Sequence, residues 1–189
     1  MNATLERNVV NPININMRYY KYLDLDFLSV AEKLKTYLLD NRDQMKGVWN
    51  NLDTQKILLL FPEVQTMFDP MNIKIKRISI VSHVVPGSSR IHRDDTNCNV
   101  RINIPILNCD NSVTNFYKTD ARPVKRFTEN GTPYLQIDNS QCVLVDSFCL
   151  NRPAALRVTE PHQVIINPDY VPRISCTIEF VENIDYLLD

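Results

Sequence analysis

The sequence predicts a mainly β protein with flanking helices, arranged as an antiparallel β-sandwich or jelly roll. From residue 72 onward, several short stretches alternate apolar and polar residues, which is the period of a strand with two different faces. Turn sequences separate these stretches, and two helical patterns precede them. Strands that follow helices, instead of alternating with them, favour an antiparallel arrangement over a doubly wound parallel sheet.

The two helical patterns are amphipathic. The first spans residues 27–40, and Asp24 or Asp26 is placed to cap its N-terminus. Its apolar residues recur at helical spacing and form one stripe, made of Phe27, Val30, Ala31, Leu34, Tyr37 and Leu38. The second helix is expected to begin at Pro62 and to bury Val64, Met67 and Phe68. We expect both helices to cover one face of a sheet.

The strand patterns are clearest in three stretches, at residues 73–80, 100–106 and 174–180. The pair Asn130-Gly131 is the strongest hairpin signal in the chain. It predicts a tight turn between strands near residues 123–128 and 132–137. Pro86-Gly87 marks a further turn.

The overall composition bounds the domain organisation and the partners. With 189 residues, 44% of them hydrophobic, the chain suits one domain over residues 1–189. Within it we expect a helical covering segment at about 1–71 and a jelly-roll core at about 72–183. The sequence contains no apolar segment typical of a secretory signal and no apolar run long enough to span a membrane. The net charge is −1, and the five cysteines show no CxxC spacing. We therefore expect a cytoplasmic protein with reduced thiols, without a membrane or nucleic-acid partner, and of open oligomeric state.

One constellation of residues points to metal chemistry. In His92-Arg93-Asp94 the histidine and the aspartate are two apart, so on a strand both side chains point the same way and can bind one ion. Asp95 is the adjacent alternative, but it would point to the opposite face. His162, in a later β-like stretch, supplies a second imidazole. Two imidazoles and one carboxylate form the facial triad of Fe(II) oxygenases, which leaves positions open for an oxoacid and O2.

A second pair of residues follows the distal histidine. Arg173 comes eleven residues after His162, and Ser175 lies two residues further along the same strand face. A guanidinium beside a hydroxyl is a good receptor for a carboxylate. An arginine on a solvent-facing strand is the alternative reading.

These residues lie in two blocks, RIHRDDTNCNVRINIPILN and PHQVIINPDYVPRISCTIEF, which resemble the motif blocks of 2-oxoglutarate/Fe(II)-dependent dioxygenases. The resemblance covers about Val81 to Phe180, and the blocks are most similar to the prolyl-hydroxylase-like and aspartyl/asparaginyl β-hydroxylase-like branches. It implies a double-stranded β-helix (cupin-type jelly roll). It implies Fe(II) bound by the catalytic triad His92, Asp94 and His162, with 2-oxoglutarate bound by Arg173 and Ser175 and O2 as the second cosubstrate.

The resemblance extends to further residues and to the reaction. The string TNCNVRINI is similar to a TNC-x-x-R-x-H pattern, which implies that Arg101 and Asn103 help to hold 2-oxoglutarate, although Asn103 stands where the pattern has histidine. Tyr117, on the next expected strand, could donate its hydroxyl to 2-oxoglutarate or could be a half-buried packing residue. The implied reaction is hydroxylation of a small-molecule or peptidyl substrate, with a peptidyl or free amino acid as the leading class.

Two other classes of protein use a similar set of side chains. A non-catalytic cupin-like module would use the metal and the cleft only to hold a ligand. A zinc-dependent hydrolase or isomerase would use the same two histidines and aspartate. The Arg173-x-Ser175 pair disfavours the zinc enzyme, because zinc hydrolysis needs no clamp for a second carboxylate cosubstrate. We expect His83 to be a structural strand histidine and Trp49 to be a packing residue.

Overall fold

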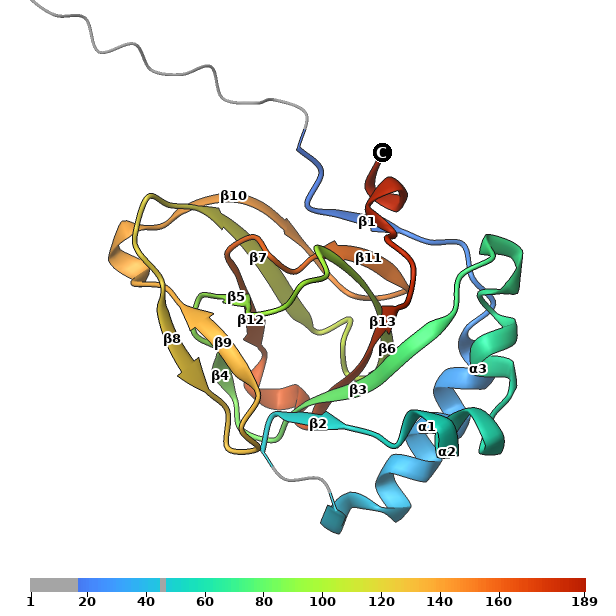
Figure 1. The fold of residues 1–189 in the computed structure, drawn as a ribbon. Coiled ribbons are helices and arrows are strands. Elements are labelled where there is room, and N and C mark those ends of the chain that lie inside the picture. Colours follow the sequence, from blue (N-terminus) through green and yellow to red (C-terminus); the bar gives the residue numbers. More distant parts are fainter. Residues whose placement is uncertain (1–16, 45–46) are drawn as a thin grey trace, which may run out of the picture.

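The computed structural model describes residues 17–44 and 47–189, which form two facing antiparallel sheets with helices on one side (Figure 1). Within the described residues, the first sheet has six strands. In spatial order they are β1 (Tyr20–Tyr22), β11 (Ala154–Arg157), β6 (Val100–Leu107), β13 (Arg173–Phe180), β3 (Ile75–His83) and β2 (Trp49–Asn51).

The second sheet pairs its strands in the order β10 (Val143–Phe148), β7 (Ser112–Lys118), β12 (His162–Ile166), β5 (His92–Asp94), β9 (Pro133–Gln136) and β8 (Val124–Phe127), and β4 (Gly87–Ser88) pairs with β12. From β3 onward the chain crosses between the sheets at nearly every step. Thus β3, β6, β11 and β13 lie in the first sheet, and β5, β7, β10 and β12 lie in the second. The exceptions are β4 and β5, which follow each other in the second sheet, and the passage from β7 to β10, where the β8–β9 hairpin is inserted. This winding is a double-stranded β-helix, which confirms the predicted fold class.

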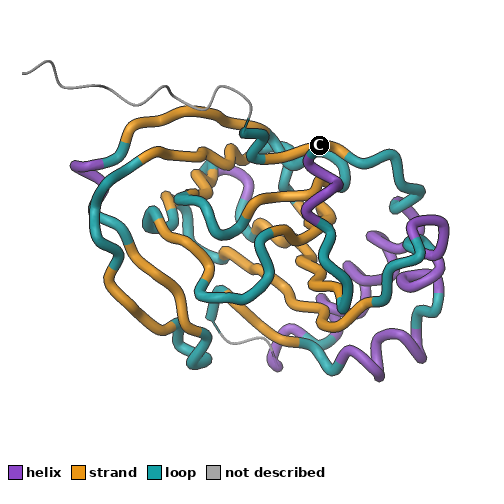
Figure 2. Tube along the Cα trace, turned by 45° about the horizontal axis from the view of Figure 1, so that its top comes forward, coloured by secondary structure: helices purple, strands orange, loops and turns teal. Residues whose placement is uncertain are grey.

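Three α-helices, α1 (Leu28–Asp40), α2 (Thr54–Leu60) and α3 (Glu63–Thr66), cover the outer face of the first sheet. Figure 2 shows the helical segments gathered mainly on that side of the molecule. The short 3-10 helices are Arg42–Gln44, Asp69–Met71, Asn139–Gln141, Pro168–Tyr170 and Asp185–Leu188. None of the helices in the described ranges is long and apolar enough to cross a membrane.

The N-terminal part differs from the prediction in three ways. Phe27 is the N-cap of α1 and no side chain caps it, so the expected capping by Asp24 or Asp26 is wrong. Helix α2 was not predicted, and Asp53 caps it by accepting a 3.0 Å hydrogen bond from the Lys56 amide. Strands β1 and β2 lie within the segment that was expected to be helical, because they complete the edges of a sheet whose other strands come much later.

The first sheet buries both of its faces. The outward residues of β6 and β13, such as Ile102, Ile104 and Ile178, are fully buried under the helices, and each contributes about 1.5–3 kcal/mol by that burial. The inward residues of β13 are Arg173, Ser175, Thr177 and Glu179, and they are buried too because they face the second sheet. A row of polar and charged side chains is therefore held inside the protein.

The β8–β9 hairpin forms as the Asn130-Gly131 signal predicts. The Thr128 amide donates to the Thr132 carbonyl at 2.9 Å, and Gly131 has a φ of 76°, which favours glycine. The Asn130 side chain donates to the Trp49 carbonyl of β2 at 2.7 Å. The turn of this hairpin in the second sheet is thus attached to the edge of the first sheet.

Candidate metal centre and cosubstrate cavity

The two sheets enclose a cavity of about 650 Å³. Its walls are the inward-facing residues of β3, β6 and β13 from the first sheet and of β5, β7 and β12 from the second. A cavity of this size suits a small ligand. Seven of the sequence-predicted site residues line it: His92, Asp94, Arg101, Asn103, His162, Arg173 and Ser175.

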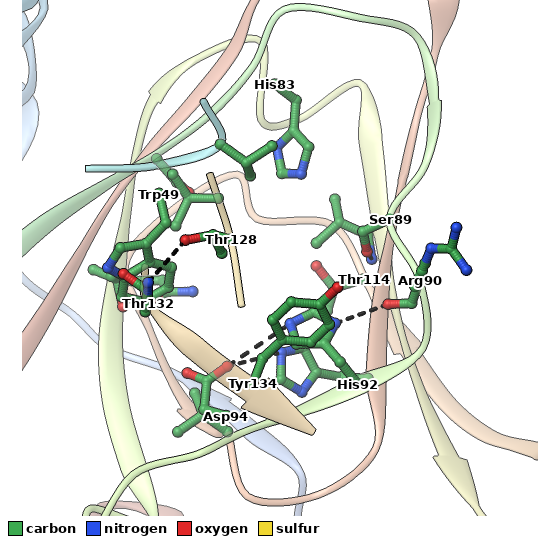
Figure 3. A pocket seen from close by; sticks show the side chains of 18 of the residues that line it. Trp49, His83, Ser89, Arg90, His92, Asp94, Thr114, Thr128, Thr132 and Tyr134 are labelled. Atoms are coloured by element: carbon green, nitrogen blue, oxygen red, sulfur yellow. Dashed lines mark hydrogen bonds and ion pairs between the residues drawn. The ribbon is translucent and has the colours of Figure 1, made fainter. Parts of the chain in front are cut away.

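The three predicted metal ligands converge in this cavity. His92 and Asp94 project from β5, and His162 projects from β12 at the position directly opposite His92. The Asp94 Oδ1 atom lies 3.8 Å from His92 Nε2 and 4.0 Å from His162 Nε2. One donor atom from each of the three side chains lies within 4.8 Å of the others. Figure 3 shows Asp94 and His92 close together in the cavity. Residues 70 positions apart in the chain thus meet because β5 and β12 are neighbours.

Backbone carbonyls fix the orientation of both histidines. His92 Nδ1 lies 2.8 Å from the Arg90 carbonyl, and His162 Nδ1 lies 2.9 Å from the Glu160 carbonyl. A proton on Nδ1 donates to that carbonyl and leaves the Nε2 lone pair directed at the cluster, as in most metal-binding histidines. Burial, together with the charge of His92, lowers the pKa of His162 to about 4, so this imidazole is neutral and able to bind a metal at neutral pH.

The donor set fits Fe(II). Two imidazole nitrogens and one carboxylate oxygen, open on one side to a cavity, are the ligands of a facial triad. Asp95, the alternative carboxylate, forms an ion pair with Lys125 at 2.7 Å and does not join the cluster. Of the two adjacent aspartates, Asp94 is thus the one that lies close to both histidines.

The predicted carboxylate receptor lies in the same cavity. Arg173 is only 2% exposed. Its Nε donates to Ser112 Oγ at 2.8 Å, and one terminal nitrogen donates to Ser175 Oγ at 3.2 Å. Among the residues that the structure describes, no carboxylate forms an ion pair with Arg173. A buried guanidinium without a counter-ion is costly, and an anionic ligand would remove that cost.

His83 also lines the cavity, contrary to the expectation that it is a satisfied structural histidine. It pairs with Arg173 across β3 and β13, is 8% exposed, and its Nδ1 has no hydrogen-bond partner. Burial, followed by the charges of Arg173 and His92, lowers its pKa to about 4. His83 is therefore a neutral imidazole on the strand position opposite Arg173. In Figure 3 it lies at the opposite end of the view from Asp94.

Arg101 and Asn103 share the inward face of β6 and line the cavity, but their contacts differ. The Asn103 Oδ1 atom is buried without a hydrogen-bond partner, so it is free to bind a ligand. Arg101 is already engaged: one terminal nitrogen donates to Asp94 Oδ2 at 2.5 Å and the other to Glu179 Oε2 at 3.3 Å. Arg101 thus donates a hydrogen bond to Asp94, one of the predicted metal ligands.

The structure does not bring Tyr117 into the cavity. Thr114 and Phe116 are the residues of β7 that line it, and Tyr117, on the opposite face, donates its hydroxyl to Gln163 Oε1 at 2.8 Å. The sequence contained no marker for which face of β7 is internal. The strand was predicted, but its orientation was not.

Aromatic residues near the metal cluster were missed as cavity residues. Trp49 lines the cavity from β2, with the Arg101 guanidinium 5.3 Å from its ring centroid. Tyr134 of β9 meets the His92 ring edge-on, with ring centroids 5.9 Å apart, and Phe127 of β8 is 63% exposed at the cavity wall. No sequence pattern marks these residues, because β2 and the β8–β9 hairpin reach the cavity only through long-range pairing.

Comparison with known proteins supports the fold assignment. No family model matches the sequence, and no curated protein matches it. Among solved structures, the non-heme alpha-ketoglutarate-dependent epimerase SnoN from nogalamycin biosynthesis superposes with a TM-score of 0.50 at 12% identity, over 87% of this chain and 78% of its own.

Two further solved structures are similar at lower TM-scores. AviO1 from Streptomyces viridochromogenes Tue57 has a TM-score of 0.48 at 12% identity, over 88% of this chain and 91% of its own. EvdMO1 has a TM-score of 0.47 at 14% identity, over 88% of this chain and 48% of its own. At these identities the likeness concerns the fold. Together with the strand order, the match to SnoN supports a cupin-type double-stranded β-helix fold for this chain.

Proposed function

We propose that the protein is an Fe(II)- and 2-oxoglutarate-dependent oxygenase that hydroxylates a C–H bond of its substrate. The observation that carries the proposal is the buried guanidinium of Arg173, which pairs with no carboxylate of the described residues, in the cavity that also holds the His92, Asp94 and His162 cluster. A metal-binding module or a zinc hydrolase has no need of this second feature. An oxoacid cosubstrate needs both, because it binds the metal at one end and carries a second carboxylate at the other.

The receptor for that second carboxylate is built from rigid strands. Ser112 and Ser175 accept hydrogen bonds from Arg173 and so fix the plane of its guanidinium, which leaves the remaining N–H groups for a ligand. His83 and Asn103 add unpartnered polar atoms to the same cavity. We propose that these five residues form the 2-oxoglutarate site, with Arg173 supplying the charge.

Apolar residues shield the metal end. Phe116 is fully buried beside the His162 ring, with ring centroids 6.1 Å apart, and it packs with Leu156 and Val158, which also line the cavity. Such a wall excludes water and protects a reactive centre from side reactions. When bound, Fe(II) would supply the activation of O2 coupled to decarboxylation of 2-oxoglutarate to succinate. The protein's own contribution is to bind, orient and shield.

The substrate would approach where Trp49, Phe127 and Tyr134 border the cavity. Half-exposed aromatic rings offer flat apolar surfaces with polar edges, which suit a ring-shaped or amide-containing group. A peptidyl or free amino acid remains our proposed substrate class, on the strength of the two motif blocks.

The test is binding of 2-oxoglutarate to protein loaded with Mn(II), a redox-stable stand-in for Fe(II), measured by calorimetry without oxygen. Arg173→Ala should raise the Kd by about 100-fold or more, since two or more charge-assisted hydrogen bonds are lost. Arg122→Ala is the matched control, because Arg122 is exposed and outside the cavity lining. Absence of 2-oxoglutarate binding to metal-loaded wild type would refute the proposal.

A further inference from the structure

The two carboxylate oxygens of Asp94 have different neighbours. Its Oδ1 atom faces both histidine Nε2 atoms, at 3.8 and 4.0 Å. Its Oδ2 atom accepts a 2.5 Å hydrogen bond from Arg101, whose side chain is only 6% exposed. A carboxylate held in this way presents one chosen oxygen to a metal.

Arg101 is itself fixed from several sides. Its second terminal nitrogen donates to Glu179 Oε2 at 3.3 Å, and its guanidinium lies 5.3 Å from the Trp49 ring centroid. The Nε atom of Arg101 has no hydrogen-bond partner. The guanidinium is therefore held by its two ion pairs and by its contact with the Trp49 ring. Because both terminal nitrogens are engaged by carboxylates, the guanidinium edge that could clamp a ligand is occupied.

Glu179 is the anchor of this arrangement. It is 4% exposed and also accepts from Lys76 Nζ at 2.8 Å and from Arg77. Burial alone would raise its pKa, but the hydrogen bonds from Lys76 and Arg77 and the charges of Arg77 and Arg101 lower the pKa to about 2. Glu179 is therefore ionised at neutral pH.

Charge balance explains why the anchor must be an anion. A metal dication at the triad would lie near the Arg101 cation, with only the single charge of Asp94 between them. The negative charge of Glu179 offsets that of Arg101 and reduces the repulsion felt by the metal. Glu179 also ends the inward polar row of β13 that begins at Arg173, so one strand serves both the cosubstrate receptor and the metal ligand.

We propose that Arg101 is a positioning residue for the metal ligand Asp94, held in place by Glu179, and that it is not a 2-oxoglutarate contact. This inference rests on the proposed function, because it concerns the metal site used there. It replaces the cosubstrate role that the sequence resemblance implies for Arg101. Outer-shell partners of metal ligands commonly change metal affinity by about 10–100-fold when they are removed.

The experiment compares Arg101→Gln, Glu179→Gln and Arg173→Ala by two readouts: Mn(II) affinity without cosubstrate, and 2-oxoglutarate affinity at saturating Mn(II). Arg101→Gln and Glu179→Gln should weaken Mn(II) binding by about 10–100-fold and leave the 2-oxoglutarate Kd within about threefold of wild type. Arg173→Ala should show the opposite pattern. The visible spectrum of Co(II)-loaded protein should change in the first two variants only, because it reports the ligand geometry.

Two outcomes would overturn the inference. One is an Arg101→Gln variant with wild-type Mn(II) affinity and Co(II) spectrum but weakened 2-oxoglutarate binding. The other is a Glu179→Gln variant that leaves metal affinity unchanged; this isosteric variant also decides the question if Arg101→Gln does not fold. Failure of wild type to bind any divalent metal would instead refute the proposed function, so the two failures are distinguishable.

Discussion

His92 lies directly opposite His162 on the antiparallel strands β5 and β12, with their ring centroids 4.4 Å apart. Register between these strands thus determines whether a metal site exists at all. A shift of one residue would turn one imidazole to the other face of the sheet. The backbone carbonyls of Arg90 and Glu160 then orient the two rings.

The first prediction separates the ligand histidines from the third histidine. His162→Gln should reduce Fe(II) or Mn(II) affinity by about 100-fold or more, because one of three ligands is lost. His83→Gln should keep metal affinity within a few-fold of wild type, since His83 lies outside the cluster. Metal titration of both variants checks this. Equal losses in the two variants would show that the triad is wrongly assigned.

A second prediction concerns the serines that support Arg173. Ser112→Ala removes the acceptor for Arg173 Nε and frees the guanidinium to rotate. The Kd for 2-oxoglutarate should rise by about 5–10-fold, which corresponds to the loss of one ordinary hydrogen bond. Metal affinity should not change. Ser140→Ala, on the surface and remote from the cavity, is the control. An effect of Ser112→Ala on metal affinity alone would contradict the assigned role.

Much of this architecture follows from sequence pattern, and the remainder depends on long-range pairing. Period-two alternation predicted β6 and β13, and Asn130-Gly131 predicted the β8–β9 hairpin. Helix α2 was not predicted, because the apolar run at residues 57–61 is continuous and shows no helical period. Strands β1 and β2, of three residues each, are too short to produce a pattern.

The site shows the same division. Five candidates could be chosen from the sequence, because metal-ligand or carboxylate-binding side chains stand two residues apart on predicted strands or follow such a pair: His92, Asp94, His162, Arg173 and Ser175. The contact of Arg101 with Asp94 could not be predicted from the sequence, because it joins β6 of one sheet to β5 of the other. For Tyr117 the sequence left a cosubstrate contact and a packing role open, because nothing in it reports the orientation of β7, and the structure places its hydroxyl on Gln163, outside the cavity.

The third prediction concerns pH and the apoprotein. The pKa values of His83 and His162 are lowered to about 4 in the folded state, against an ordinary value of 6.5. The unfolded chain therefore takes up these protons first, and stability is lost as the pH falls from 6.5 towards 4. Each histidine should account for about 2–3 kcal/mol of the loss between pH 7.5 and 4.5.

Urea unfolding at these two pH values checks this, with His83→Gln as the test variant. Between these two pH values, the free energy of unfolding of His83→Gln should fall by about 2–3 kcal/mol less than that of wild type, which is the contribution of one histidine. Glu179, with a pKa of about 2, contributes stability that is lost only below pH 4.5. Identical pH dependence in wild type and His83→Gln would show that His83 is not buried in its neutral form.

The fourth prediction tests the packing of the helices on the first sheet. Leu34 of α1 is fully buried, whereas Leu59 of α2 is 83% exposed. Leu34→Ala should lower the free energy of unfolding by about 2–5 kcal/mol through lost burial and a residual cavity. Leu59→Ala should change it by less than about 0.5 kcal/mol. A small effect at Leu34 would mean that α1 does not cover the core.

The most direct test of the account is the visible spectrum of the Fe(II)-loaded protein, recorded without oxygen before and after addition of 2-oxoglutarate. We predict a new metal-to-ligand charge-transfer band, which is absent in His162→Gln and needs a much higher 2-oxoglutarate concentration in Arg173→Ala. A wild-type protein that binds Fe(II) and develops no such band would contradict it, and the cavity would then be that of a metal-binding module or hydrolase.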